Sequence, residues 1–317
     1  MTLGTQENRE PFPTAVKSSG RSLGVLLDQH RAWVEGRNGG VRADLSRVTM
    51  NDLTLPGIKL AKAELSHTTW LDSDLSGADL SGASLQHVDF RQARLTSTDF
   101  TGADLTRAMC DNVWMHATNL SETNLSECSF RSANLEEARF LDARLHESRF
   151  DSANLKKARL HQAKIFQCSF NYAQLDGAHL YHVRAQFCSF LSSSMTEANL
   201  GNSIMQDCDF TSANLIDAKL NNCDLSRSCF MKSKLEAVDF RQAKLSGAEF
   251  GRANLAFARF GGAVMFCTDL RGANLLSARE LTSEQLCQAR TDSTTVLPNG
   301  TTGPYMKFSG AERPATK

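Results

Sequence analysis

Proline is scarce in this sequence, and neither sign of charge is in excess: its 317 residues include 6 Pro, 20 Gly, 35 basic and 35 acidic side chains. The composition excludes a collagen-like or disordered chain, because 41% of the residues are hydrophobic and can bury a core. A net charge of zero argues against a strongly basic nucleic-acid binder and against a strongly acidic mimic of DNA. Asp, Asn, Arg or Lys interrupts every apolar stretch before the roughly 18 residues that a membrane helix needs, so no membrane insertion is expected.

Signals for secretion and for catalysis are also missing. Residues 1–20 contain charges and two Pro but no apolar run, and nine Cys is an odd number, so neither a secretory signal nor a disulfide framework is predicted. A reducing cytoplasm is therefore the expected location. The sequence has no glycine-rich phosphate loop, metal-ligand quartet or nucleophile elbow. We expect a protein that is not an enzyme and that binds no cofactor and no metal.

A repeat of five residues dominates the sequence. From Leu45 to Leu275 every fifth residue is a centre of fixed type, which gives 47 consecutive pentads without an insertion; 26 of the centres are Leu and 12 are Phe. A small residue, usually Ala, Ser, Thr or Cys, stands two positions before each centre. A period of five fits neither the 3.6-residue period of an α-helix nor the two-residue period of a strand. Each pentad must therefore contain a bend, and its small residue and its centre point inward from a short extended segment.

The positions of Phe indicate how many pentads make one coil. All 12 Phe centres fall at multiples of ten, and most of them, from Phe90 to Phe250, share one phase of a 20-residue period that only Cys110 interrupts. The phase through Leu55, Leu75 and Leu95 carries no Phe. A four-sided coil of 20 residues explains this segregation, because residues 20 apart then stack in one column. About 12 coils that rise about 4.8 Å each predict a rod on the order of 55 to 60 Å long.

The repeat resembles that of the pentapeptide-repeat family, whose pattern is A(D/N)LxX. Ala78-Asp79-Leu80, Ala133-Asn134-Leu135 and Ala213-Asn214-Leu215 match this pattern literally. The resemblance implies an all-β solenoid, namely a right-handed quadrilateral β-helix of about 12 coils with short helical caps at both ends, in a bacterial protein of the cytoplasm. The handedness comes from the family alone.

The segments outside the repeat predict caps, because a solenoid exposes an apolar cross-section and unpaired backbone groups at each end. Residues 21–40 have the pattern of a short amphipathic helix followed by a loop. Residues 280–291 predict one short helix, in which Thr282 and Gln285 have the spacing of a capping box. The β-helix is expected to occupy residues 41–279, and residues 1–20 and 292–317 are expected to be flexible tails.

Two groups of potential metal or redox residues are interpreted as structural. A free thiol at the small inward position before the Phe column is a small apolar filler, and side chains that project in parallel are poorly aimed for a disulfide. A pair of stacked histidines without a third ligand makes a poor metal site. The residues concerned are Cys128, Cys168, Cys188 and Cys208 in the first group and His67 and His87 in the second.

Charge at the outward positions changes sign along the predicted rod. In one column Asp79 and Asp99 are followed, further along the rod, by basic residues. In the adjacent column Asp104 is likewise followed by basic residues. Stacked like charges are mildly unfavourable, so a basic ladder interleaved with exposed aromatic side chains suggests an acidic partner. An ordinary solvated face is the alternative interpretation. The candidate partner-binding residues are Arg139, Leu141, Arg144, Arg159, His161, Lys164, Phe166, Tyr181, Arg184 and Phe187.

These observations leave three functions open. The first is a cytoplasmic scaffold that binds another protein along one face of a rigid rod. The second follows from the resemblance, which includes quinolone-resistance pentapeptide proteins that imitate DNA and bind DNA gyrase and related type II topoisomerases; such mimicry needs a predominantly acidic face, and the acidic ladders here are short. The third is direct nucleic-acid binding, which would need more than about five Lys and Arg. A homodimer is a further alternative.

Overall fold

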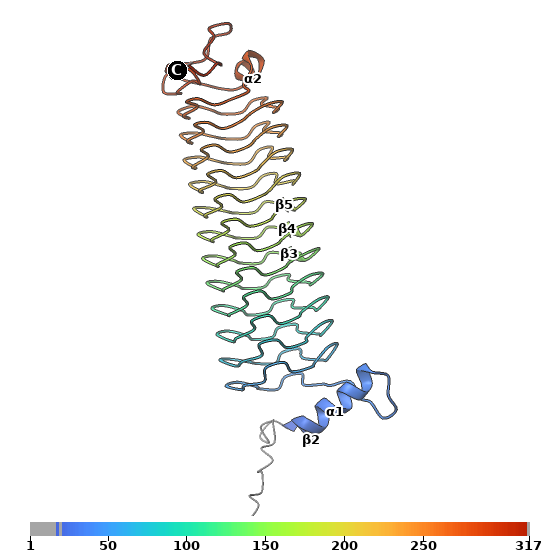
Figure 1. Cartoon of the computed structure of the whole chain (residues 1–317). Helices are drawn as coiled ribbons and strands as arrows, with labels where there is room; N and C mark the ends of the chain where they lie inside the picture. Colours follow the sequence, from blue (N-terminus) through green and yellow to red (C-terminus); the bar gives the residue numbers. More distant parts are fainter. Residues whose placement is uncertain (1–16, 19–20, 316–317) are drawn as a thin grey trace, which may run out of the picture.

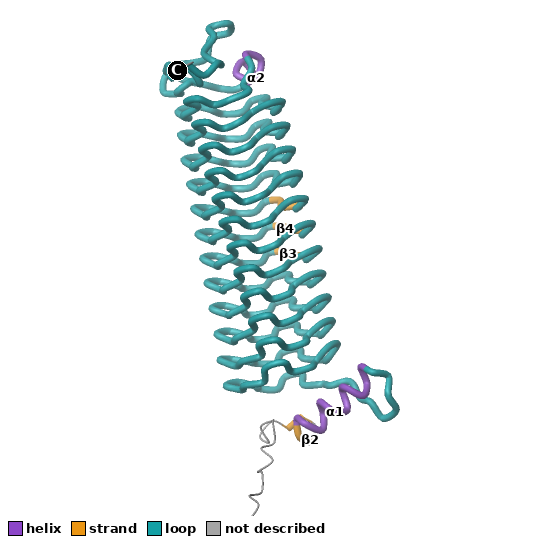
Figure 2. Tube along the Cα trace, viewed as in Figure 1, coloured by secondary structure: helices purple, strands orange, loops and turns teal. Residues whose placement is uncertain are grey.

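The computed structural model describes residues 17–18 and 21–315, and most of these residues form an elongated stack of coils (Figure 1). Parallel bridges join residues that are 20 apart, such as Asp44 to Glu64 and Asn254 to Asn274. Turns and short bridges recur every five residues along the repeat, so four sides make one coil. Figure 2 shows that turns and loops dominate the stack and that regular strands are few. The 20-residue register predicted from the Phe positions is confirmed.

Each corner of a coil is a tight turn with one residue in the left-handed backbone region. At the corner after Leu45, the Val48 N–H donates to the Leu45 carbonyl at 3.0 Å, and Arg47 has a φ of 62°. The same conformation recurs every fifth residue and falls mostly on residues other than glycine. Such a conformation costs an L-residue about 1 to 2 kcal/mol, so it persists only where the surrounding bonds fix the backbone.

Carboxylate and amide oxygens support many of these corners. Asp79 Oδ1 accepts the Ser81 N–H at 3.2 Å and the Ser81 hydroxyl at 2.7 Å, and Asn124 does the same for Ser126 at 3.3 and 2.7 Å. An Asp or Asn just before the centre therefore satisfies two polar groups just after it, as in an Asx turn. This local bond gives a physical reason for the Asp or Asn of the repeat.

The core consists of ladders of identical side chains that run along the rod. Ring centroids of Phe130, Phe150 and Phe170 follow one another at 5.0 and 4.9 Å with interplanar angles of 8° and 6°. The ladder continues through Phe190, Phe210, Phe230 and Phe250 at 4.8 to 5.0 Å. Offset or parallel packing of this kind adds to the free energy that burial of the rings contributes. The predicted aromatic column is confirmed.

Three corners in the middle of the rod adjoin the regular strands, and we call a corner open where no bond joins the N–H of the small inward residue to the carbonyl of the preceding centre. Strands β3 (Arg144–His146), β4 (Lys164–Phe166) and β5 (Arg184–Gln186) pair in parallel with a register of 20 residues. In the described structure no bond joins the Ser148 N–H to the Leu145 carbonyl; the N–H donates to Cys168 Sγ at 3.4 Å instead. By contrast, the Ala108 N–H in an earlier coil donates directly to the Leu105 carbonyl at 2.8 Å. His146 is extended here and forms the third residue of β3. The corner after Leu125 also lacks the direct bond, because the Cys128 N–H donates to Ser148 Oγ at 3.1 Å, but no regular strand forms there.

The N-terminal segment before the coils begins with a hairpin and a helix. Strand β1 (Lys17–Ser18) pairs antiparallel with β2 (Arg21–Ser22), and α1 (Leu23–Val34) lies beyond the first coil (Figure 1). The helix predicted within residues 21–40 is present. The tail predicted at residues 1–20 otherwise lies outside the described residues.

The C-terminal end differs from the prediction in extent. Helix α2 (Ser283–Gln288) is shorter than the predicted 280–291, and its capping box between Thr282 and Gln285 is present as expected. The segment expected to be a tail from residue 292 continues the stack at first: the Leu275 N–H donates to the Val296 carbonyl at 2.8 Å, and Leu297 is buried. The reason is that the last coil offers free backbone groups, which the following residues satisfy. Further along, Met306 and Phe308 are exposed.

A buried histidine holds α1 to the first coil. His30 lies on the inward face of α1 with Leu23 and Leu27, and its side chain is almost completely buried. Its Nδ1 accepts the Ala43 N–H at 3.0 Å. Burial lowers the pKa of His30; a hydrogen bond to the Ala61 carbonyl partly opposes this effect, and the positive charge of Arg42 adds to it. The docked helix therefore favours the neutral imidazole.

We expect a large difference in stability between a core and a surface substitution in the same coil. Phe170→Ala should lower the free energy of unfolding by about 3 to 5 kcal/mol, because it leaves a cavity between two stacked rings. Gln174→Ala changes an exposed outward side chain and should cost less than about 0.5 kcal/mol. Chemical denaturation measures both values, and similar losses for the two variants would contradict the ladder as the source of stability.

Acidification should loosen α1. Because the pKa of His30 is lower in the docked state than in the undocked state, docking is fully stable above the ordinary value near 6.5 and weakens as the pH falls below it. Hydrogen exchange in α1, corrected for intrinsic rates, should therefore be faster at about pH 5.5 than at about pH 7.5. His30→Asn keeps an acceptor near the position of Nδ1 but does not titrate, so it should remove this difference. Equal protection of wild-type α1 at both pH values would refute the role of His30.

Candidate binding surface

The ten predicted partner-binding residues lie on consecutive coils, over two adjacent faces and the corners beside them. We call them together the basic aromatic surface: Arg139, Leu141, Arg144, Arg159, His161, Lys164, Phe166, Tyr181, Arg184 and Phe187. Their side chains all point outward, and the five cationic ones are exposed. Parallel bridges stack Arg139 beside Arg159, and the strand register stacks Arg144, Lys164 and Arg184. The structure therefore places the two basic ladders side by side, as the columns predicted.

The residues of the basic aromatic surface stand at positions where other coils carry the hydrogen bonds that support their corners. On these two faces, earlier coils carry the supporting pairs Asp99 with Thr101 and Asn124 with Ser126. In the next coils the same positions hold cations, each followed two residues later by an apolar or ring side chain. The Asx support returns at Asn199, whose side-chain oxygen accepts the Gly201 N–H at 3.2 Å. The replacing pairs are Arg139 with Leu141, Arg144 with His146, Arg159 with His161 and Lys164 with Phe166. Corner stability therefore does not explain these residues.

The cations of this surface are not neutralised by neighbouring carboxylates. Within the described part of the chain, none of its five Arg and Lys side chains has an Asp or Glu oxygen within 4.0 Å. Elsewhere on the rod, arginine often forms a local pair, as in Arg227 with Asp207 at 2.6 Å and Arg241 with Asp239 at 2.6 Å. The positive charge here is consequently available to a partner, although salt screens it.

Exposed rings form two short ladders beside the cations. His146 and Phe166 stack at 5.4 Å with an interplanar angle of 2°, and His161 and Tyr181 stack at 4.3 Å with an angle of 21°. Phe187, which is 54% exposed, meets Phe166 edge to face at 5.6 Å. Because the rings stack in pairs along the rod, one face of each stacked ring is covered by its neighbour. Phe166 was among the partner-binding residues predicted from the sequence. His146 was not among them, although it belongs to the same column as Phe166.

The surface contains two grooves rather than one pocket. One groove of about 370 Å³ runs along β3, β4 and β5, between the ladder of Arg144, Lys164 and Arg184 and the rings of His146 and Phe166. The other, of about 250 Å³, lies on the neighbouring face. Its lining includes Glu137, Arg139, Lys157, Arg159 and His179. The corner with Leu141, His161 and Tyr181 separates the two faces, so the ten residues do not share one cavity.

Partial burial keeps one histidine of the corner uncharged at neutral pH. Loss of hydration lowers the pKa of His161, and the charges of His179 and Arg159 lower it further, although the His179 backbone opposes them. A neutral imidazole stacked on Tyr181 behaves as part of an apolar strip.

Two thiols of the cysteine column, those of Cys128 and Cys168, are held in the unreactive protonated form, whereas a hydrogen bond with Cys208 lowers the pKa of Cys188. Burial raises the pKa of Cys128 and Cys168 to about 12, so both remain thiols at neutral pH. All nine Cys are free, and among residues 17–18 and 21–315 no three His, Cys, Asp or Glu side chains are arranged to hold a metal. His67 and His87 stack at 4.6 Å as an isolated pair. The interpretation of the thiols as simple filler missed their hydrogen bonds, such as that from the Ser148 N–H to Cys168 Sγ, which accompany the open corners.

Comparison with known proteins agrees with this architecture. A family model described as "Pentapeptide repeats (8 copies)" matches residues 73–108 and 233–275, and one described as "Pentapeptide repeat region" matches residues 104–180 and 163–237. This chain belongs to the pentapeptide-repeat family. Among curated protein sequences, none matches this chain. None of the helices in the described residues is long and apolar enough to cross a membrane.

Several solved pentapeptide-repeat structures share the repeat. HetL, involved in heterocyst differentiation regulation in the cyanobacterium Nostoc sp., is 21% identical over 86% of this chain and 96% of its own, with a TM-score of 0.35. A pentapeptide repeat protein of the Arabidopsis thaliana thylakoid lumen is 29% identical over 29% of this chain and 64% of its own, with a TM-score of 0.29. QnrB1, a plasmid-mediated fluoroquinolone resistance protein, is 17% identical over 73% of this chain and 84% of its own, with a TM-score of 0.23. These values describe a shared repeat and say nothing about a shared partner.

Removal of the thiol at an open corner should close it. In Cys168→Ala the Ser148 N–H loses its sulfur acceptor, and we expect it to bond the Leu145 carbonyl, as Ala108 bonds Leu105. Residue 146 should then leave strand β3, and the loss in stability should stay near 1 kcal/mol because the lost bond is replaced. Cys223→Ala is the matched control, since the corner 20 residues before this thiol is already closed by the bond from the Ser203 N–H to the Leu200 carbonyl at 3.2 Å. A crystal structure of Cys168→Ala with an unchanged corner would show that the thiol does not hold it open.

Proposed function

We propose that this chain is a non-enzymatic binding rod and that its basic aromatic surface docks an acidic protein. The observation that carries the proposal is the joint change on two adjacent faces over the same coils, from Asx-supported corners to unpaired cations beside exposed rings. Random variation on a solvated face would not need to replace both the Asp or Asn and the residue that it supports at each corner. The rod fixes these side chains on a stack of coils, so docking orders little additional backbone. The ends are expected to be capped by α1 and α2.

The chemistry of the surface favours carboxylates. Five Arg and Lys side chains without carboxylate partners among the described residues attract negative charge. Nucleic-acid bases would need free ring faces on which to stack, and the stacking of His146 on Phe166 and of His161 on Tyr181 covers one of the two faces of each ring. An acidic protein segment therefore fits better than a single-stranded nucleic acid.

Binding to DNA gyrase through mimicry of DNA is the alternative that the family suggests. Such mimicry requires a continuous acidic face, whereas the column of Asp79 and Asp99 and the column of Asp104 continue along the rod into Arg139 and Arg144. A supercoiling assay with DNA gyrase, with and without this protein, distinguishes the alternative, because a mimic of DNA would inhibit or protect the enzyme.

Charge reversal on one ladder tests the proposed function. The triple variant Arg144→Glu, Lys164→Glu and Arg184→Glu should lose capture of its partner by at least about tenfold, and capture by the wild type should weaken as salt rises. Thermal stability should hardly change, because exposed substitutions usually shift it by less than about 0.5 kcal/mol each.

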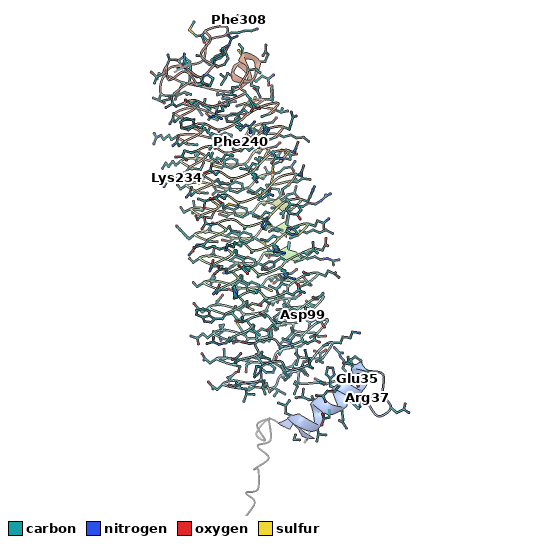
Figure 3. The ribbon with its side chains drawn as sticks, in the orientation of Figure 1. Glu35, Arg37, Asp99, Lys234, Phe240 and Phe308 are labelled. Atoms are coloured by element: carbon teal, nitrogen blue, oxygen red, sulfur yellow. The ribbon has the colours of Figure 1, made fainter. Side chains whose placement is uncertain are left out.

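A matched control reverses three exposed cations elsewhere on the rod, namely Lys219, Lys234 and Arg252, which have no ion pair among the described residues; Lys234 lies on the outside of the rod in Figure 3. Lys244 and Arg259 are unsuitable, because they pair with Asp224 and Glu280. If both triple variants keep the same partners at low and high salt, the surface is an ordinary solvated face and the proposal is wrong. Loss in both variants would indicate general electrostatics.

A further inference from the structure

The groove along β3, β4 and β5 has two chemically different walls. Because Arg144 and His146 are two residues apart on an extended strand, both side chains point outward, and their Cα atoms are about 6.7 Å apart. Stacking repeats this arrangement in the next coil with Lys164 and Phe166. The result is a cationic ladder and a ring ladder that run in parallel along the rod, with the backbone of β3 to β5 as the floor between them.

We propose that the segment that docks in this groove is an acidic amphipathic α-helix that lies parallel to the axis of the rod. The inference rests on the proposed function and names the kind of partner that the same site accepts. One stripe of the helix carries acidic residues and faces the cationic ladder. The adjacent stripe is apolar and contacts His146 and Phe166.

The spacing of the cations selects a helix over an extended segment. Arg144, Lys164 and Arg184 stand on three successive coils and span two steps of about 4.8 Å, or about 9.6 Å. Two turns of an α-helix rise about 10.8 Å, so acidic residues at i, i+4 and i+7 meet successive cations with a mismatch of about 1 Å. Residues i, i+2 and i+4 of an extended strand span about 13.5 Å, which leaves a mismatch of about 4 Å. Flexible Arg and Lys side chains absorb the first mismatch at little cost and the second only by splaying apart.

The two walls also favour an amphipathic helix over a uniformly acidic one. Carboxylates placed against Phe166 and Phe187 would lose hydration without gaining a cation. An apolar stripe there buries ring edges and aliphatic groups together and excludes water from the neighbouring ion pairs, which strengthens them.

Three designed peptides of about 20 residues, long enough for a helix in isolation, test the inference. The first carries Glu along one stripe and Leu along the adjacent stripe of an Ala-based helix. The second has the same composition and helicity, but its Glu and Leu are dispersed around the helix. The third is the first with one central Pro, which breaks the helix. Fluorescence anisotropy measures the affinity of each for the full chain.

We expect the striped peptide to bind the wild type at least about tenfold more tightly than the dispersed or the Pro peptide. The variant Arg144→Glu, Lys164→Glu and Arg184→Glu should lose this binding, and His146→Ala with Phe166→Ala should weaken it severalfold. The control variant of Lys219, Lys234 and Arg252 should bind as the wild type does. Circular dichroism of each variant confirms that the rod is folded.

Each other outcome overturns the inference in a distinguishable way. Equal affinity for all three peptides would leave the acidic docking surface intact but refute a helical partner. Equal binding of the striped peptide to wild type and to the reversed variant would place the contact elsewhere. No binding of any peptide, together with unchanged partner capture by the reversed variant, would overturn the inference and the proposed function together.

Discussion

The backbone hydrogen bonds between coils are the interaction on which the rest of this structure depends. They hold residues 20 positions apart side by side: the Leu155 N–H, for example, donates to the Gln174 carbonyl at 2.7 Å and so pairs Asn154 with Gln174. Every core ladder inherits its spacing from these bonds. With the spacing fixed near the strand separation, a buried ring meets an identical ring at 4.8 to 5.0 Å in the next coil. A side chain that points outward is subject to the same spacing without being buried. The ladder that makes the core regular therefore also makes surface charges and rings periodic.

The inward small position links the core to the shape of the surface. Ser148 Oγ accepts the Cys128 N–H at 3.1 Å and donates to the Leu125 carbonyl, so one hydroxyl stands between two groups that bond each other directly at other corners. Ser, Thr and Cys compete for backbone partners in this way, whereas Ala cannot. A buried residue thus takes part in opening a corner, and three of the open corners adjoin the strands that form the floor of the groove.

The periodic features were predictable from the sequence, and the features that depend on individual hydrogen bonds were not. A column of Phe from Phe130 to Phe250 and the stacking of Arg144, Lys164 and Arg184 follow from counting in steps of 20. The capping box of Thr282 and Gln285 is a local pattern and was also correct. The open corner at Ser148 depends on a bond to the sulfur of Cys168, 20 residues later, and on geometry that periodicity does not contain. The stacking of Val296 on the last coil was missed for a related reason: it breaks the five-residue phase and is set by free backbone groups at the end of the rod.

A repeat with a structural reason for each position makes departures from the repeat informative. Asp99 bonds Thr101 at the corner, so an Asp or Asn at this position needs no functional explanation. Arg159 and His161 occupy the equivalent positions three coils later without such a bond, and neither corner support nor an ion pair accounts for the cation. One such exchange is ordinary sequence variation. Several exchanges that stack in neighbouring columns of a rigid rod produce parallel ladders of charge and rings, and their fixed spacing restricts the geometry of any partner that contacts more than one rung.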